Sequence, residues 1–360
     1  MIQDSFLKSF RETKSPFITN PYRFAGAGAV GGWVEVGRTT LGSAGDDITV
    51  SSLADKRYYM FLTSALNSGD NALSLQMGSG SVDTGSNYAQ RFSNDGAADG
   101  SGVNQTKIFC GDNNTSPKFN VGYIANLSSK EKLYQGWEVM QYTAGAGAAP
   151  RRMESTGKWA NTSNPLDTIN FNNVMGGSYD TGSEMVVLGW DPADTHTTNF
   201  WEELASVESD GTSSVLSSGT FTAKKYLWIQ CYIAGNSVSR DYATRVGNGT
   251  VDTGNNYSLR GSTNGGSDGT VTSSDKLSFM GGNKTTPRCL NIFMINNSAN
   301  EKLMIVHKIT GETAGASNAP ARGEIVGKWA NTSSQANIIS FDCVVGTINS
   351  GSMVKVWGSD

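Results

Sequence analysis

Short apolar runs separated by polar, turn-forming residues recur along the whole chain. Residues 56–66 (KRYYMFLTSAL) and 224–235 (KKYLWIQCYIAG) are rich in aromatic and β-branched side chains, which favour strands over helices. Residues 167–174 (DTINFNNV) and 338–344 (IISFDCV) alternate apolar and polar positions, and this pattern predicts half-buried strands. Clusters of Gly, Asn, Asp and Ser between the runs are typical of turns. We therefore expect a protein built from β-strands.

Two longer segments each predict a β-hairpin. Residues 119–142 (FNVGYIANLSSKEKLYQGWEVMQY) place two apolar strands around the turn LSSKE, and residues 290–309 (LNIFMINNSANEKLMIVHKI) repeat the arrangement. The only candidate helix is short and lies near the N-terminus (DSFLKSFRE). Each half of the chain is expected to hold roughly eight to ten short strands.

The two halves of the chain are copies of one unit. The heptapeptide GKWANTS occurs at 157–163 and again at 327–333, and VDTGSNY at 82–88 matches VDTGNNY at 251–257. The matched segments follow in the same order, with offsets of 168 to 170 residues. An internal duplication is therefore predicted.

These patterns together predict an all-β protein of two tandem β-sandwich domains with a jelly-roll-like arrangement. We expect an extended N-terminal arm over 1–31, a first domain over 32–191, a linker over 192–199 and a second domain over 200–360. The two domains are called repeat 1 and repeat 2 below.

Composition and charge narrow the range of partners. The chain is 37% hydrophobic and 17% charged, with 43 glycines and a net charge of −4, so it offers no basic surface for nucleic acid. No apolar run is long enough for a membrane span, and no secretory signal is visible, so membrane insertion is not expected. Two histidines and four cysteines without metal-type spacing predict no metal or other cofactor. We interpret the cysteines as mostly free, buried thiols of a protein made in a reducing cytoplasm.

The Asp-Thr-Gly triplets at Asp83 and Asp252 raise the hypothesis of an aspartic protease, which carries one such triplet in each lobe. That mechanism needs two carboxyl groups close enough to share one proton. Here loop-like, Gly-rich sequence precedes both triplets, and a third triplet begins at Asp180, within repeat 1. Turn formation explains all three, because an Asp side chain bonds nearby backbone and Gly accepts a positive φ.

Other candidate catalytic groups have simpler interpretations. Three glutamates are matched between the repeats, and each could serve a glycosidase, but nearby basic residues predict structural ion pairs instead: Glu35/Glu203, Glu131/Glu301 and Glu154/Glu324. Neither His196 nor His307 has a histidine at the matching position of the other repeat. Residues 94–100 and 264–269 could offer oxygens to Ca²⁺, but they lack the ligand density of a dedicated loop and are interpreted as turns. No catalytic, cofactor-binding or metal-binding residue is therefore assigned.

Matched aromatic residues are the remaining candidates for contact with a ligand or a partner. Tyr88, Trp159, Tyr257 and Trp329 could form an interface or a platform for a glycan if their rings are exposed, although such residues are often core anchors. In the arm, Phe17, Ile18, Tyr22 and Phe24 precede a Gly/Ala-rich stretch, and we expect them to dock on a neighbouring subunit or another protein.

Several strings together resemble a known group of proteins. The series W-x-E, AKKYLWIQ, DTGNNYS-R, GGSD, NEKL, TAGA and AP-R-E-VGKWANTS is similar to uncharacterised structural proteins of tailed bacteriophages, particularly marine ones. The resemblance covers nearly the whole chain after Trp33. It implies a component of the virion, such as a capsid decoration, a head fibre or a tail-associated protein, and it implies no catalytic residues.

Three hypotheses about function follow. The first is a non-enzymatic virion structural protein that is made in the host cytoplasm, contacts other virion proteins and forms a homo-oligomer, with a trimer as one option. The second is a receptor-binding or carbohydrate-binding protein on the same particle, directed at a host surface glycan. The third is a hydrolase.

Overall fold

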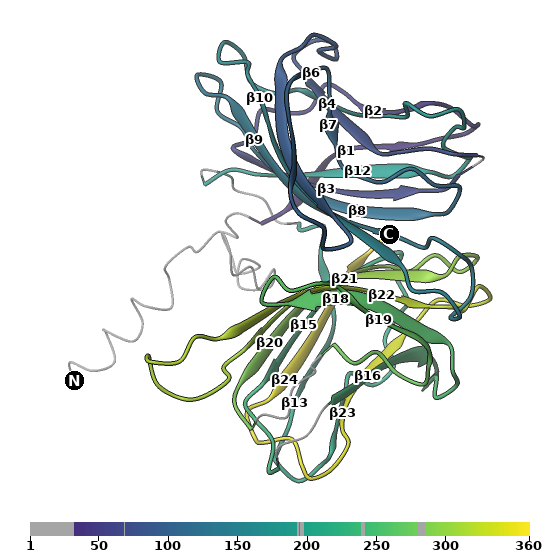
Figure 1. The fold of residues 1–360 in the computed structure, drawn as a ribbon, viewed down its shortest axis with the longest axis vertical. Helices are drawn as coiled ribbons and strands as arrows, with labels where there is room; N and C mark the ends of the chain where they lie inside the picture. The colour runs from purple at the N-terminus through teal and green to yellow at the C-terminus, as the bar shows by residue number, and fades with distance from the viewer. Residues whose placement is uncertain (1–31, 68, 193, 195–197, 239–241, 280–284) are drawn as a thin grey trace.

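The fold is taken from a computed structural model, which describes residues 32–360 except 68, 193, 195–197, 239–241 and 280–284. The predicted docking residues Phe17, Ile18, Tyr22 and Phe24 therefore lie outside the described residues, as does the candidate helix. Every regular element in the described part of the chain is a β-strand, as the sequence predicts (Figure 1).

Repeat 1 folds into two antiparallel sheets, one of eight strands and one of four. Its strands are β1 (Val34–Thr40), β2 (Asp47–Val50), β3 (Tyr58–Ala65), β4 (Ser74–Gly78), β5 (Tyr88–Asn94), β6 (Gly100–Gln105), β7 (Ile108–Phe109), β8 (Lys118–Ala125), β9 (Lys132–Met140), β10 (Arg151–Trp159), β11 (Thr168–Asn172) and β12 (Glu184–Trp190).

Repeat 2 builds the same pair of sheets, and the strand order differs only at the edge of the four-stranded sheet: repeat 1 uses residues 108–109 there, whereas repeat 2 uses residues 250–251, which match residues 81–82 of repeat 1. Its strands are β13 (Glu202–Glu208), β14 (Val215–Ser217), β15 (Tyr226–Ile233), β16 (Tyr242–Asn248), β17 (Thr250–Val251), β18 (Tyr257–Thr263), β19 (Gly269–Ser274), β20 (Arg288–Ile295), β21 (Lys302–Thr310), β22 (Ala321–Trp329), β23 (Ile338–Cys343) and β24 (Met353–Ser359).

The strand order is that of a jelly roll with an enlarged sheet. In repeat 1 the orders β1-β12-β3-β8 and β2-β11-β4-β7 place the first strand beside the last and send the chain repeatedly from one sheet to the other. Strands β9, β10, β5 and β6 then extend the first sheet to eight. The predicted fold class is confirmed. The expected eight to ten strands per repeat were too few, because short strands such as β7 and β17 have only two residues each.

Both predicted hairpins are present, as β8–β9 and β20–β21. The prediction that 167–174 forms a half-buried strand was only partly correct. β11 lies in the interior of the four-stranded sheet, and its polar residues are buried as well as its apolar ones. Asn170 accepts a hydrogen bond from the Thr49 hydroxyl at 3.0 Å and donates one to Asp47 at 2.9 Å, which satisfies its amide.

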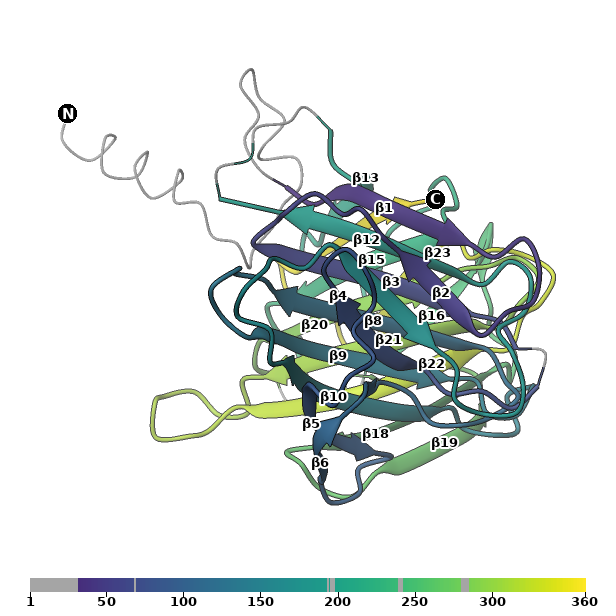
Figure 2. The same cartoon turned by 90° about the horizontal axis from the view of Figure 1, so that it is seen from above.

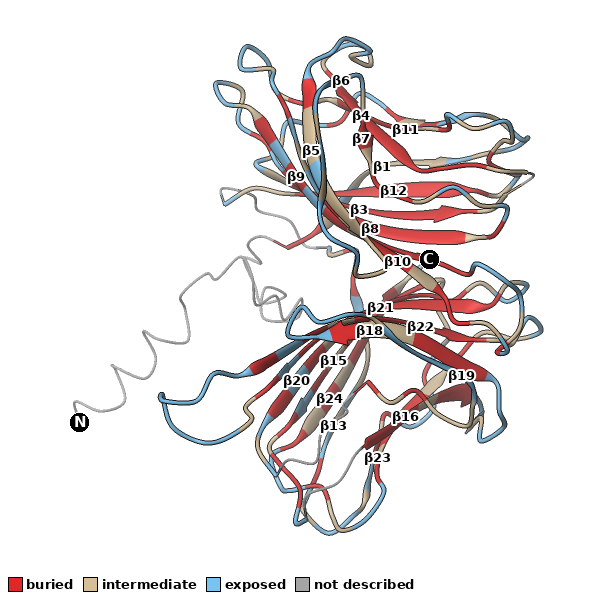
Figure 3. Ribbon diagram, viewed as in Figure 1, coloured by how far each residue is buried: buried red, intermediate tan, exposed pale blue. Residues whose placement is uncertain are grey.

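Each domain has a separate hydrophobic core between its two sheets. A third cluster of buried apolar residues lies between the domains, where the outer faces of the two eight-stranded sheets pack against each other (Figure 3). Each large sheet is therefore covered on both faces over much of its area. In Figure 2 the sheet of repeat 1 lies over that of repeat 2, and β9 contacts β21.

The large sheets meet at an angle and do not remain in contact along their whole length. In Figure 1 they converge on the right, where the turn between β9 and β10 reaches repeat 2, and they separate on the left. The strips of the two matched faces that form the contact correspond only in part, since counterparts such as Trp33 and Trp201 both lie in the cluster. Repeat 1 contributes residues such as Phe119 and Val139, whereas repeat 2 contributes Phe293 and Ile305, which are not their counterparts. The domain pair is therefore asymmetric, and this asymmetry leaves a cleft.

Candidate functional site

The Asp83 triplet is a structural turn. One carboxylate oxygen of Asp83 accepts a hydrogen bond from the Gly85 amide at 2.8 Å. The other accepts from Asn87 Nδ2 at 2.9 Å and from Trp159 Nε1 at 2.8 Å. Burial acts to raise the pKa of Asp83, but these hydrogen bonds outweigh it and hold the pKa below its ordinary value. An ionised carboxylate with three donors fixes the turn.

Repeat 2 reproduces this arrangement around Asp252, which accepts from Gly254, Asn256 and Trp329 at 2.8, 2.9 and 2.7 Å. The third triplet is also a turn, since Asp180 accepts from the Thr181 amide at 2.7 Å and Gly182 has φ +85°. The turn interpretation of all three triplets is confirmed, but the expected positive φ occurs only at Gly182 and not at Gly85 or Gly254. The triplet is shared because both repeats need the same turn and the same tryptophan anchor.

The matched aromatic residues are buried, so the proposed contact with a glycan or a partner through them was wrong. Tyr88 and Trp159 are each 1% exposed and Tyr257 and Trp329 are 0% and 2% exposed, all within the domain cores. Their polar atoms bond inside the domain: the Tyr88 hydroxyl, for example, donates to the backbone oxygen of Asp83 at 2.8 Å. These rings close the back of each Asp-Thr-Gly turn and cannot stack on a molecule from solvent.

The matched glutamates form ion pairs, as expected. Glu35 pairs with Arg38 at 2.8 Å and Glu203 with Lys355 at 3.1 Å. The neighbour in sequence is not always the partner: Glu131 pairs with Lys158 at 2.9 Å rather than with Lys132. Lys132 instead is buried and donates to backbone oxygens, including that of Asn161 at 2.9 Å.

His307 lies at the domain interface, with its ring 4.5 Å from the ring of Trp137. Burial, and then the positive charge of Arg152, lower the pKa of His307 to about 4. The imidazole is therefore neutral near pH 7 and packs as an aromatic ring. His196 lies outside the described residues.

The two Asn/Asp/Gly loops are turns whose carboxylates are already engaged. Asp95 has φ +51° and accepts from Arg151 Nε at 2.7 Å, while Asp268 pairs with Arg152 at 2.8 Å. Among the described residues no group of three or more His, Cys, Asp or Glu side chains is placed to hold a metal ion.

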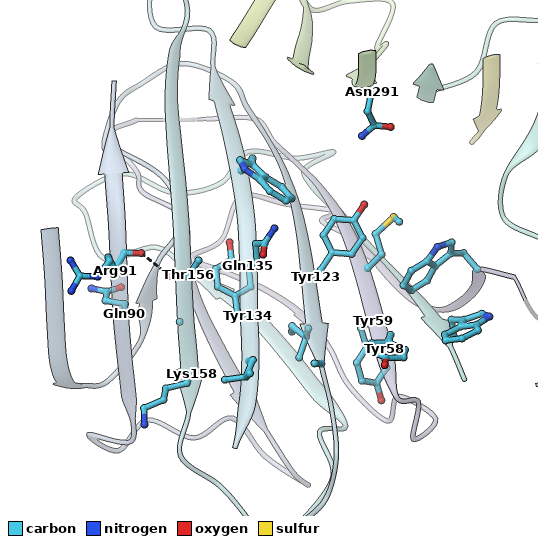
Figure 4. A pocket seen from close by; sticks show the side chains of 18 of the residues that line it. Tyr58, Tyr59, Gln90, Arg91, Tyr123, Tyr134, Gln135, Thr156, Lys158 and Asn291 are labelled. Atoms are coloured by element: carbon cyan, nitrogen blue, oxygen red, sulfur yellow. Dashed lines mark hydrogen bonds between the residues drawn. The ribbon is translucent and has the colours of Figure 1, made fainter. Parts of the chain in front are cut away.

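The candidate site is the cleft between the two large sheets, with a volume of about 970 Å³. Its main wall is the outer face of the repeat 1 sheet. One row of side chains crosses five neighbouring strands of that face: Arg91, Thr156, Gln135, Tyr123 and Met60. Repeat 2 supplies the facing wall through Trp228, Gln230 and Asn291. Figure 4 shows Asn291 facing the repeat 1 sheet across the cleft.

Aromatic rings line much of this cleft. The six whose rings contribute to its outer-face walls are Trp33, Tyr58, Tyr123, Trp137, Trp190 and Trp228. Tyr58 stacks on Trp190 with ring centroids 5.5 Å apart, and Tyr123 meets Trp33 and Trp137 edge to face at 6.3 and 6.1 Å. These contacts hold the rings in place, so the wall is largely preformed.

Polar groups without a protein partner lie among the rings. Within the described residues no hydrogen bond is formed by the Tyr123 hydroxyl or by the side-chain amides of Gln135 and Gln230. The side-chain oxygen of Asn291 accepts a hydrogen bond from Trp228 Nε1 at 2.5 Å, so the NH₂ group of Asn291 remains available as a donor. Burial alone raises the pKa of Tyr123, so this hydroxyl is protonated and can donate as well as accept.

The cleft carries little net charge. Lys158 and Arg91 lie at its rim, but Lys158 pairs with Glu131 at 2.9 Å and Arg91 with Asp99 at 3.7 Å. The lining contains no Asp or Glu. The site can therefore hold a ligand that offers hydroxyl groups and flat apolar faces, without requiring a charged one.

Sequence reasoning did not find this site, although the repeat contains a signal for it. Gln135 and Thr156 of repeat 1 correspond to Ile305 and Val326 of repeat 2, which are buried between the domains. These positions face outward in both repeats, and they are polar in repeat 1 but apolar in repeat 2. This difference marks the part of the repeat 1 face that is open to solvent.

Comparisons with known proteins do not identify the chain: no family model matches it, and no curated protein is significantly similar to it. No helix in the described part of the chain is long and apolar enough to cross a membrane.

Proposed function

We propose that this chain is a non-enzymatic structural protein of a phage particle and that its interdomain cleft binds carbohydrate. The observation that carries the binding role is the lining of the cleft, where preformed aromatic rings alternate with unpaired amide and hydroxyl groups. The virion role rests on the sequence resemblance. A pair of jelly rolls with a low net charge is compatible with display on a particle.

Carbohydrate fits this chemistry better than other small ligands. A pyranose ring has an apolar C–H face that packs on an aromatic ring, and it has hydroxyl groups around its edge that donate and accept hydrogen bonds. Tyr58 and Trp190 offer the flat surface, and Gln135, Gln230 and Tyr123 offer the hydrogen-bonding groups. The absence of unpaired charge in the lining favours a neutral sugar chain.

The lining also favours binding over cleavage. Glycoside hydrolysis generally uses two carboxyl groups on either side of the scissile bond. The residues that line the cleft include neither Asp nor Glu. Asp83 and Asp252 are each held by three donors in their own turns, which leaves them unsuited to share a proton.

Titration of the full chain with a panel of neutral oligosaccharides tests the binding role, with tryptophan fluorescence and calorimetry as readouts. Tyr123→Phe removes one hydroxyl and keeps the ring, so we expect an affinity about fivefold lower, equal to one net hydrogen bond of about 1 kcal/mol. Tyr232→Phe is the matched control, since this tyrosine is 45% exposed and does not line the cleft. Equal loss in both variants, or no binding by any oligosaccharide, would contradict the proposal for the cleft.

The virion role is tested separately. Purified particles should contain the chain in a fixed number per particle, detected by mass spectrometry, and electron microscopy should show paired jelly rolls on the particle. Particles that lack the chain would refute this role and leave the binding result intact.

A further inference from the structure

The turn between β9 and β10 of repeat 1, residues 141–150, is held on the large sheet of repeat 2. We call this contact the inner dock. The Lys328 ammonium donates to the backbone oxygens of Gln141 and Thr143, and it is completely buried beside Glu301, with an N–O distance of 3.4 Å. Glu301 in turn accepts from the Gly145 amide.

Further hydrogen bonds fix the rest of this turn. The Ser273 amide donates to Ala146 O at 2.7 Å, Ser258 Oγ to Ala148 O at 3.0 Å, and Arg260 Nε to Pro150 O at 2.9 Å. Immediately after the turn, Arg152 pairs with Asp268 at 2.8 Å, with both side chains buried. The inner dock therefore joins the domains through a specific polar contact in addition to their apolar cluster.

Repeat 2 contains the same turn at residues 311–320, and among the described residues no strand of repeat 1 packs on it. Thr-Ala-Gly-Ala recurs at 313–316, and the backbone conformation is preserved: φ is +66° at Tyr142 and +54° at Glu312, and +83° at Gly145 and +98° at Gly315. Residues 313–320 are nevertheless all exposed. In Figures 1 and 2 this turn, between β21 and β22, projects away from the body of the molecule.

The surface that receives such a turn is also preserved, on the large sheet of repeat 1. The counterparts of Lys328 and Glu301 are Lys158 and Glu131, which form an ion pair with side chains 46% and 38% exposed. Arg260 corresponds to Arg91, Asp268 to Asp99, and Ser273 to Asn104, and all three of these counterparts are exposed. Asn104 keeps the positive φ of Ser273, at +51° against +47°. Only Ser258 has lost its polar group, since its counterpart is Ala89.

Two exposed apolar residues flank these surfaces. Ile309, just before the turn of repeat 2, and Leu133, on the receiving face of repeat 1, are both 57% exposed. Their counterparts Val139 and Leu303 are 0% and 2% exposed, within the apolar cluster between the domains. Large apolar side chains at the edge of a preserved polar contact mark an interaction surface.

We propose that the turn at 311–320 docks on the repeat 1 sheet of a second copy of this chain and so repeats the inner dock between molecules. We call this contact the outer dock. Lys158 would donate to the Thr313 oxygen, Glu131 would accept from the Gly315 amide, and Asn104 and Arg91 would donate to the oxygens of Ala316 and Pro320. Arg322 would pair with Asp99.

A second chain is the occupant that this surface fits, because the complementary surface is present on the chain itself. Within one molecule the turn at 311–320 does not reach the receiving face of repeat 1, since the sheets diverge on the side where this turn projects (Figure 1). The contact is head to tail, joining repeat 2 of one chain to repeat 1 of the next, so it generates a closed ring or an open filament rather than a two-fold dimer. The inference does not depend on the virion role, but its receiving surface shares Arg91, Leu133 and Lys158 with the lining of the cleft, so a docked chain and a ligand in the cleft compete for this face.

Sedimentation velocity of the full chain over a wide range of concentration tests the outer dock. The wild type is expected to self-associate. Ala316→Arg should weaken the association by about tenfold or more, because the counterpart Ala146 is 8% exposed in the inner dock and the contact has no room for a long side chain. Ser317→Arg is the matched control and should have no effect, because its counterpart Gly147 stays exposed when docked.

Charge exchange identifies the two surfaces. Arg322→Asp and Asp99→Arg should each weaken the association, and a chain with both substitutions should recover it, because the reversed pair can form between neighbouring molecules. Circular dichroism melting verifies that each variant is folded. A wild type that stays monomeric at every concentration, or association that Ala316→Arg leaves unchanged, would overturn the proposal.

Discussion

The Asp-Thr-Gly turns yield the sharpest prediction about stability, and Asp252→Ala is the change that tests it. The substitution removes the acceptor for three donors, of which Trp329 Nε1 belongs to a residue that is 2% exposed. A buried donor that loses its partner costs about 1–3 kcal/mol, and the loss of a turn-capping carboxylate costs about 1 kcal/mol more. We expect repeat 2 to be destabilised by about 2–4 kcal/mol.

Thermal and urea unfolding, followed by calorimetry and tryptophan fluorescence, measure this change. For a domain of this size about 3 kcal/mol lowers the melting temperature by roughly 6–12 °C. Asp83→Ala should have the same effect in repeat 1, because Asp83 bonds the same three groups. Thr253→Ala is the control within the triplet: its side chain is exposed, and the expected change is within about 0.5 kcal/mol.

The result that would refute this reasoning is an Asp252→Ala protein that unfolds like the wild type. The carboxylate would then be dispensable for the fold, and its retention in both repeats would need a chemical explanation. A variant destabilised as expected, with Thr253→Ala unchanged, supports the structural role of the triplet.

Two further predictions follow from buried groups. A maleimide should label Cys289 in the native protein, because this thiol is exposed. The buried thiols of Cys110, Cys231 and Cys343 should react only after unfolding. Mass spectrometry of the labelled protein measures this, and rapid labelling of any of the three in the native protein would contradict the prediction. Burial acts to raise the pKa of Glu184, but hydrogen bonds from Lys225, Thr40 and Tyr226 outweigh it and hold the pKa below its ordinary value. The stabilisation of the folded protein by this carboxylate is therefore complete at pH values above the ordinary pKa of a glutamate. It is lost as the pH falls through the lower pKa that Glu184 has in the folded protein. The melting temperatures of wild type and Glu184→Gln should therefore differ most near pH 7 and converge towards pH 3, and a constant difference would contradict the assignment.

Much of the fold could be read from the chain alone, and particular segments show why. The hairpin at 119–142 was predictable because two apolar strands flank a polar turn only a few residues long, so the contacts that stabilise it are local. The Asp83 turn was predictable for the same reason, since Asp83 bonds Gly85 and Asn87. The burial of Tyr88 and Trp159 was not predictable, because a ring contacts either solvent or core according to how distant strands pack.

The sequence by itself determined the strands, their turns and the duplication, because alternation of side chains and the chemistry of short turns act within a few residues. The cleft was decided only by the tertiary structure. Gln135, Tyr123 and Asn291 meet there because two sheets from different domains pack along strips of the same face that match only in part. The angle between those sheets depends on the packing of many side chains far apart in the chain, and no local pattern encodes it. The exposure of the turn at 311–320 has the same origin: its sequence matches that of 141–150, and only the asymmetry of the domain pair leaves it uncovered.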